Sequence, residues 1–196
     1  MARGAGYDLF LTQAEAVLTL RIADGTRRNA DSQVANYTSP DPQSAYIKIK
    51  LAGANPAPAL SGLGPSPGAS NYFIGARNWR TGVFSYERVK YADVYPGVDM
   101  IYYGNQRDLE YDFKVAPGAD PALIKVSFEA ESGRAPVRVD ADGDLIIETA
   151  AGQIRQLKPF AYQEVDGAKK QIAARYVLRG SHVAFSLGAY DKSKPL

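Results

Sequence analysis

NYFIGARNWRTGVFSYERVKYADVYPGVDMIYYGNQRDLEYDFKVAPGADPALIKVSF, residues 71–128, is the stretch that decides the fold. Its apolar residues alternate with polar ones along several short runs, and two Pro-Gly pairs separate some of those runs. Successive side chains of a β-strand point to opposite faces of the sheet, so alternation indicates strands with one buried and one wet face. The stretch therefore predicts antiparallel strands joined by tight turns.

Alternation is clearest at residues 109–115 (LEYDFKV), where apolar and charged side chains follow one another without interruption. Residues 46–51 and 124–128 repeat the pattern. Near the start of the chain, residues 7–11 and 18–22 flank a polar turn and predict an opening hairpin. Further strands are predicted at residues 83–91, 98–103, 137–139, 145–149, 153–157, 172–178 and 183–187.

Turn chemistry supports these strand boundaries. Tyr95-Pro96-Gly97-Val98 and Ala116-Pro117-Gly118-Ala119 both have Pro second and Gly third, the arrangement typical of a type II turn. Asp120-Pro121 then supplies an N-cap and a first helical residue, which predicts one helical turn near residues 122–124. Hairpin turns are also predicted at two Asp-Gly pairs: Asp142-Gly143 and Asp166-Gly167.

Residues 53–70 consist mostly of Ala, Gly, Pro and Ser. We predict a long surface loop within one domain, because the two hairpins before it would be marginally stable on their own; a domain boundary is the alternative. Many alternating strands without a long amphipathic helix favour an all-β fold. The prediction is an antiparallel two-sheet β-sandwich, a single large domain over residues 1–196 with at most one helical turn.

Bulk composition is that of an ordinary globular domain. The 196 residues are 45% hydrophobic and 22% charged, with a formal net charge of +2. This balance gives no electrostatic basis for binding nucleic acid, and no apolar run reaches the roughly 20 residues of a membrane helix. Cysteine is absent, which excludes thiolate nucleophiles and cysteine metal sites, and no cofactor is implied. Residues 1–4 lead directly into strand sequence without a signal peptide, so we expect the natural chain to begin further upstream.

Candidate catalytic groups are sparse. The only histidine, His182, precedes an alternating strand and lacks a Gly-x-Ser-x-Gly elbow, which favours a strand-end role over a serine triad. Glu110 and Asp112 are two residues apart on one strand, so they project from one face at roughly 7 Å, near the range of an inverting glycosidase pair. Because alternation alone places charges on a wet face, we predict no enzymatic activity; a polysaccharide-acting enzyme is the least favoured alternative.

Residues 140–144 (DADGD) superficially resemble a calcium loop. An EF-hand loop has its Gly at the sixth position, whereas this Gly is fourth and strand-like sequence follows at once. A hairpin turn is therefore favoured, with an adventitious calcium site as the alternative.

Aromatic side chains crowd residues 79–111, interleaved with arginines. Tyr, Trp and Arg are enriched at binding interfaces, but tyrosines also line the rim of a sandwich core, where each hydroxyl reaches a partner. We favour the core interpretation, although Tyr102 and Tyr103 are adjacent, so that one of the two must face outward or into a second layer. The ligand-binding candidates are Trp79, Arg80, Tyr102, Tyr103, Arg107, Glu110 and Asp112.

Four runs carry a resemblance to a known family: residues 71–75 (NYFIG), Trp79-Arg80, residues 91–103 (YADVYPGVDMIYY) and residues 109–121 (LEYDFKVAPGADP). The chain resembles, over essentially its whole length, the N-terminal domain of large bacterial cell-surface proteins that carry SBBP repeats of the β-propeller type. Residues 188–196 look like the exit strand that leads into the first repeat of such proteins. The resemblance implies an extracellular, non-catalytic module.

We expect a structural or interaction module at the cell surface, whose partners are the downstream repeat domains of the same chain and a surface glycan or protein. The alternative is a carbohydrate- or peptide-binding module that uses the aromatic side chains between Trp79 and Tyr111. Neither nucleic acid nor membrane insertion is expected.

Overall fold

The computed structural model describes residues 2–4, 6–21, 44–74, 78–105 and 108–196. These residues form an all-β fold, as predicted, in which every strand pair is antiparallel. The elements are β1 (Ala2–Gly4), β2 (Tyr7–Leu11), β3 (Glu15–Arg21), β4 (Ser44–Leu51), β5 (Ala59–Ile74), β6 (Asn78–Tyr95), β7 (Val98–Asn105), β8 (Asp108–Val115), η1 (Pro121–Leu123), β9 (Val126–Ala130), β10 (Gly133–Arg134), β11 (Val137–Val139), β12 (Leu145–Thr149), β13 (Gly152–Gln156), β14 (Ala161–Val165), β15 (Ala168–Ile172), β16 (Ala174–Arg179) and β17 (His182–Leu187).

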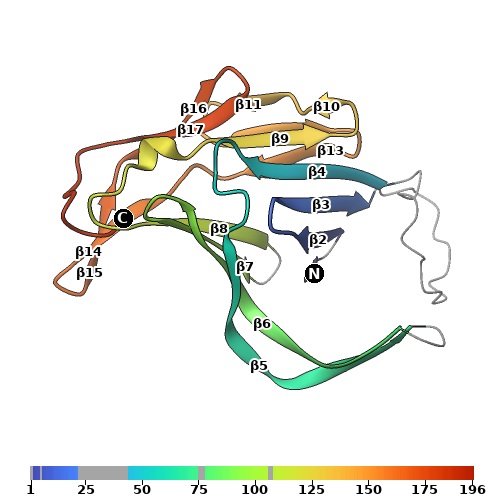
Figure 1. The fold of residues 1–196 in the computed structure, drawn as a ribbon. Coiled ribbons are helices and arrows are strands. Elements are labelled where there is room, and N and C mark those ends of the chain that lie inside the picture. Colours follow the sequence, from blue (N-terminus) through green and yellow to red (C-terminus); the bar gives the residue numbers. More distant parts are fainter. Residues whose placement is uncertain (1, 5, 22–43, 75–77, 106–107) are drawn as a thin grey trace.

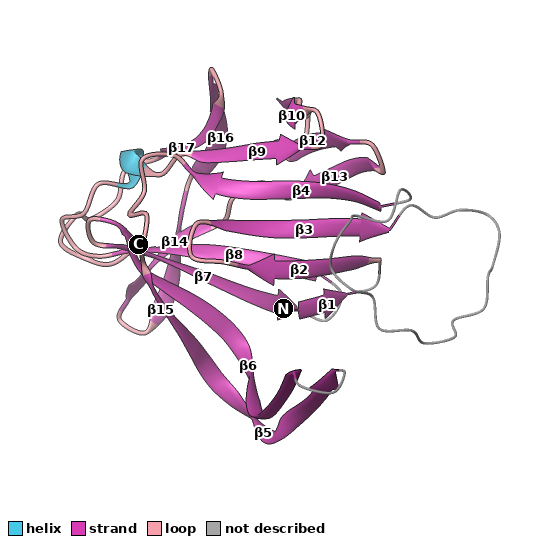
Figure 2. Cartoon of the chain, turned by 45° about the vertical axis from the view of Figure 1, so that its right-hand side comes forward, coloured by secondary structure: helices cyan, strands magenta, loops and turns pink. Residues whose placement is uncertain are grey.

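Two large sheets form the layers of the fold. The eight-stranded sheet has the order β1-β2-β3-β4-β9-β17-β16, with β10 paired to β9, and the four-stranded sheet has the order β5-β6-β7-β8. A three-stranded sheet, β11-β12-β13, and the β14-β15 hairpin complete the fold. Figure 2 shows β2, β3, β4 and β9 side by side across the body.

The core lies between the two large sheets, as a sandwich requires. Leu9 and Ile47 of the eight-stranded sheet and Val98 and Met100 of the four-stranded sheet are almost fully buried in one hydrophobic cluster. In β7 every second side chain is buried, which is the alternation that its sequence predicts. Direct contact across the layers comes from Phe113 of β8 and Phe185 of β17, whose ring centroids are 5.9 Å apart.

The turns confirm several sequence predictions. Gly97 and Gly118 both have positive φ, 71° and 77°, as the third residues of type II turns do. The Asp120 side chain caps η1 by accepting a hydrogen bond from the Ala122 N–H at 2.9 Å. In the Asp166-Gly167 pair both residues have positive φ, 52° and 76°, because a tight two-residue hairpin requires it.

The predicted loop over residues 53–70 is wrong from Ala59 onward, where the chain forms β5 and pairs with β6. A proline breaks a central strand, but β5 is an edge strand with hydrogen bonds on one side only, so Pro65 and its neighbours are tolerated. Small residues have a packing role here: a Cβ at Gly62 would collide with the Tyr86 ring. The low hydrophobicity of residues 59–70, which suggests a loop, therefore reflects their position in an edge strand.

β5 and β6 are 16 and 18 residues long and extend beyond the end of β7. We call residues 64–74 and 78–87 the arm. Figures 1 and 2 show that the arm leaves the body as a curved two-stranded ribbon. Among the arm side chains that the structure describes, the large apolar ones of Val83, Phe84 and Tyr86 are exposed.

The Tyr95 hydroxyl joins three segments of the chain. It lies 3.0 Å from the Ala52 carbonyl oxygen and 3.3 Å from the Lys125 carbonyl oxygen, and it accepts a hydrogen bond from the Lys125 N–H at 3.3 Å. Tyr95 is only 4% exposed, so water has little access to replace these bonds. The hydroxyl therefore holds the β4–β5 connection against the start of β9.

We predict that Tyr95→Phe lowers the free energy of unfolding by about 1–3 kcal/mol, because it removes a hydroxyl whose buried backbone partners have little access to replacement water. Urea denaturation measures the change. The matched control is Tyr86→Phe, whose ring is half exposed on the arm and for which we expect a change within about 0.5 kcal/mol. Equal effects of the two substitutions would contradict the role assigned to the Tyr95 hydroxyl.

Candidate functional site

The wet face of the four-stranded sheet carries a row of interacting polar side chains. Arg88 on β6, Tyr103 on β7 and Glu110 on β8 are register neighbours. The Arg88 guanidinium lies over the Tyr103 ring, 5.6 Å from its centroid, and Asn105 donates a hydrogen bond to Glu110 Oε1 at 2.9 Å. We call Arg88, Tyr103, Asn105, Glu110 and Asp112 the Tyr103 cluster.

Tyr103 connects the two carboxylates that the sequence places on one face. Its hydroxyl lies 3.0 Å from Glu110 Oε2 and 3.1 Å from Asp112 Oδ1. A phenol has one proton to donate, so it can satisfy only one of these oxygens at a time. Burial, and next the charge of Asp112, raises the pKa of Tyr103 well above its usual value. The phenol therefore stays a neutral donor at physiological pH.

The Tyr103 cluster can recognise polar groups. Two carboxylates and a guanidinium at the surface offer acceptors and donors to a ligand hydroxyl or amine. As a catalytic pair the carboxylates are poorly placed, because the Tyr103 hydroxyl already lies between them, where a substrate or an attacking water would have to enter. The geometry thus fits binding better than hydrolysis.

The neighbouring tyrosines face the other way, as the core interpretation predicts. Tyr102 is 5% exposed, and its ring lies between Tyr91 and Tyr111 at centroid distances of 5.8 and 5.7 Å. This ring has no free face for a ligand. Of the adjacent pair, Tyr102 therefore belongs to the core and Tyr103 to the surface.

The remaining predicted site residues lie elsewhere. Trp79 and Arg80 belong to β6 near the end of the arm, where the Trp79 backbone is opposite Phe73. Arg107 lies outside the described residues. The structure therefore brings together Tyr103, Glu110 and Asp112 and places the backbone of Trp79 and Arg80 on the arm.

The hydroxyls of Tyr91, Tyr111 and Tyr176 find internal partners. Tyr91 donates to the Thr12 carbonyl oxygen at 2.7 Å, and Tyr176 donates to the Leu157 carbonyl oxygen at 2.8 Å. Gln156 donates to both Tyr111 and Tyr176, at 2.8 and 2.7 Å. Burial raises the pKa of Tyr91 to about 12 and that of Tyr176 to about 12.

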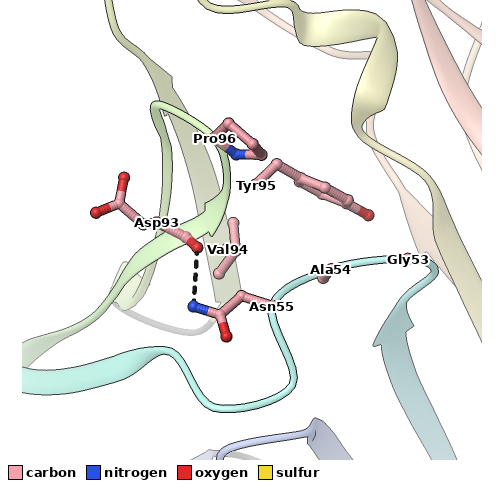
Figure 3. Close-up of a pocket in the computed structure, with 7 residues that line it drawn as sticks. All are labelled: Gly53, Ala54, Asn55, Asp93, Val94, Tyr95 and Pro96. Atoms are coloured by element: carbon pink, nitrogen blue, oxygen red, sulfur yellow. Dashed lines mark hydrogen bonds between the residues drawn. The ribbon is translucent and has the colours of Figure 1, made fainter.

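A surface pocket of about 410 Å³ lies where residues 53–55 pack on residues 93–96 (Figure 3). Its polar groups already serve the fold: Asn55 Nδ2 donates to the Asp93 carbonyl oxygen at 3.3 Å, and the Asn55 N–H donates to the Val94 carbonyl oxygen at 2.8 Å. The Asp93 carboxylate points away from Asn55 in the close-up. The pocket is a structural junction with few groups left to recognise a ligand.

The DADGD run forms a turn whose three carboxylates share one guanidinium. Arg155 Nη2 lies 2.6 Å from Asp144, 3.3 Å from Asp142 and 3.9 Å from Asp140. The Lys158 N–H, and next the Arg155 guanidinium, lowers the pKa of Asp144. Across the part of the chain that the structure describes, no group of three or more His, Cys, Asp or Glu side chains is arranged to hold a metal ion.

Gln163 is a structural residue that sequence reasoning missed. It is 2% exposed and binds the backbone of residues 191–195. A signal was present in AYQEV, because strand alternation places Gln163 on the same side as Ala161 and Val165. A lone amide on the apolar side of a strand predicts a buried hydrogen-bonding partner.

Comparison with known proteins identifies the family. The family model described as "Domain of unknown function (DUF7948)" matches residues 1–196, so the chain belongs to that family. No curated protein and no solved structure matches the chain. Within the described residues, no helix has the length and hydrophobicity needed to span a membrane.

We predict that stability falls between pH 10 and pH 12. Unfolded tyrosine ionises near pH 10, whereas folded Tyr91 and Tyr176 keep their protons until about pH 12, so the unfolded state loses protons first. Their contribution is fully present below pH 10 and is lost as the pH rises through about 12. Each contributes a slope of about 1.4 kcal/mol per pH unit in this interval.

Urea unfolding at several alkaline pH values measures how steeply the free energy of unfolding falls with pH. Tyr91→Phe should make this slope shallower by about 1.4 kcal/mol per pH unit, the contribution of one tyrosine. A free energy of unfolding that stays constant from pH 10 to pH 12 would show that these hydroxyls are not buried.

Proposed function

We propose that this domain is a non-catalytic, extracellular structural module at the N-terminal side of a multidomain bacterial surface protein of the SBBP-repeat type. Its task is to hold the domain that follows in a fixed orientation. The supporting observation is the way in which residues 188–196 are fastened to the body.

Gln163 fastens this segment from β14. Its Nε2 lies 2.8 Å from the Asp191 carbonyl oxygen and 3.2 Å from the carbonyl oxygens of Lys194 and Pro195, and its Oε1 accepts a hydrogen bond from the Asp191 N–H at 2.9 Å. Within the segment, the Ser193 N–H and the Ser193 hydroxyl both donate hydrogen bonds to Asp191 Oδ1. A buried amide that forms hydrogen bonds with four backbone groups fixes the path of the chain.

A second attachment lies at Leu196. Its N–H donates to the Val115 carbonyl oxygen at 3.0 Å, and its carbonyl oxygen accepts from the Val115 N–H at 2.8 Å. The Leu196 side chain packs against the hydrophobic core, and Gly118 N–H donates to the Lys192 carbonyl oxygen. Because Gln163 and Val115 both hold this segment in place, a domain joined to it would have a fixed orientation relative to the body.

We predict that Gln163→Met frees this segment. The substitution keeps the size of the side chain but leaves the Asp191 N–H and the carbonyl groups of Lys194 and Pro195 without the Gln163 amide, which lowers the free energy of unfolding by about 2–3 kcal/mol. Hydrogen exchange at Asp191 and Leu196 should become faster. Gln171→Met on β15 is the control, because Gln171 is exposed and its loss should change neither quantity.

The function itself is tested on the domain with and without its natural downstream repeat. Docking predicts a higher melting temperature and slower exchange in the joined protein, and Gln163→Met should weaken both effects. Identical melting and exchange in the two proteins would contradict the proposal.

A second candidate function, binding of a carbohydrate or peptide, is favoured by the arm. Phe84 is 59% exposed and Tyr86 is 47% exposed on a ribbon that extends away from the body. Exposed aromatic faces supply contact area to sugars and extended peptides at low entropic cost. The Tyr103 cluster lies on the same sheet and offers polar groups.

We predict that a glycan or peptide found by array screening binds at least about tenfold more weakly to the double variant Phe84→Ser/Tyr86→Ser. Leu157→Ser/Phe160→Ser is the matched control, because it removes two exposed apolar side chains outside the arm. Equal loss in both double variants, or no binding by the unmodified protein, would count against this function.

A further inference from the structure

The outer edge of β8 is an incomplete β-ladder. β8 is the last strand of the four-stranded sheet, and within the described residues no strand pairs with its outer side. One rung is nevertheless present, formed by Val115 and Leu196. Such an edge is a template for adding a strand.

The geometry of this rung sets the direction of the missing strand. Val115 and Leu196 exchange both of their N–H···O hydrogen bonds, at 2.8 and 3.0 Å. A residue pair that exchanges both bonds is the hydrogen-bonded pair of an antiparallel ladder. A strand that continued from Leu196 would therefore run antiparallel to β8.

The alternation of backbone groups shows which residues of β8 are open. Val115 turns its N–H and carbonyl outward, whereas the next residue, Ala116, donates inward to Gly97 of the β7 turn at 2.8 Å. Backbone groups alternate in direction along a strand, so the outward groups are those of Leu109, Tyr111 and Phe113. These three residues are the next rungs of the ladder.

We infer that the free edge of β8 receives the strand that follows Leu196 in the longer protein, an inference that rests on the proposed function. The second residue after Leu196 lies opposite Phe113 and the fourth lies opposite Tyr111, because each rung advances two residues on both strands. The four-stranded sheet thereby becomes five-stranded, and the connection to the next domain is part of this sheet.

Side chains on β8 define the chemistry of the added strand. Phe113 and Tyr111 pack toward the core, so the residues opposite them are apolar. Glu110 and Asp112 lie on the other face, so residues there are basic or carry hydroxyls. Lys114 shares this face, so the charges across a β8–β8 junction with a second copy would depend on its register, and the dependence of exchange on protein concentration separates that case.

Hydrogen exchange at individual amides tests the inference on two proteins, residues 1–196 and the natural protein that continues past Leu196. The amides of Leu109, Tyr111 and Phe113 should exchange about 100-fold more slowly in the longer protein. The amides of Glu110 and Asp112 are the internal controls, since they bond to β7 and should be protected in both.

A pair of variants in the longer protein isolates the first rung. Leu196→Pro removes the N–H that bonds Val115 and should return Leu109, Tyr111 and Phe113 to fast exchange. Leu196→Ala shortens the side chain but keeps both backbone bonds, so protection should persist.

Equal exchange of the three amides in both proteins would overturn the inference. If the longer protein still melts at a higher temperature, the proposed docking stands and uses another surface; if it does not, the proposed function fails as well. Protection that rises with protein concentration would also overturn the inference, because it would show pairing with a second copy.

Discussion

The hydrogen bonds of Gln156 hold the three main parts of the fold together. Its amide donates to Tyr111 of the four-stranded sheet and to Tyr176 of the eight-stranded sheet, while Gln156 itself belongs to the three-stranded sheet. The Tyr176 hydroxyl in turn donates a hydrogen bond to the Leu157 carbonyl oxygen. A buried hydroxyl without a partner destabilises a core, so these bonds require the three sheets to meet in one arrangement.

This constraint explains why the tyrosine-rich sequence has two different faces. Tyr91, Tyr102 and Tyr111 form a contacting row inside the sandwich, which continues through Phe113 to Phe185 on the opposite sheet. Their burial removes most of the aromatic surface that a sugar-binding platform would need. What is left at the surface is the Tyr103 cluster, the exposed rings of the arm and the fastened segment at residues 188–196, which is why the proposed function is one of interaction.

Much of the fold could be predicted from period-two patterning, because residues 109–115 and 98–103 are half-buried strands whose sequence alternates accordingly. The region of residues 59–70 could not, since the edge position that tolerates Pro65 and Gly62 depends on a partner strand later in the chain. For the candidate site, the shared face of Glu110 and Asp112 follows from spacing alone. The Tyr103 hydroxyl between them, and the Arg155 guanidinium beside three aspartates, follow from cross-strand register, which local sequence does not specify.

The central claim is that the sheets joined at Gln156 unfold as one cooperative unit. Native-state hydrogen exchange measured against urea concentration tests it most directly, by comparing amides in the middle of β7, β12 and β17. If the claim is correct, the slowest amides of all three strands converge on the same free energy of opening and the same dependence on urea. Separate limiting free energies for the three sheets, with β12 or β7 opening while β17 stays protected, would contradict it.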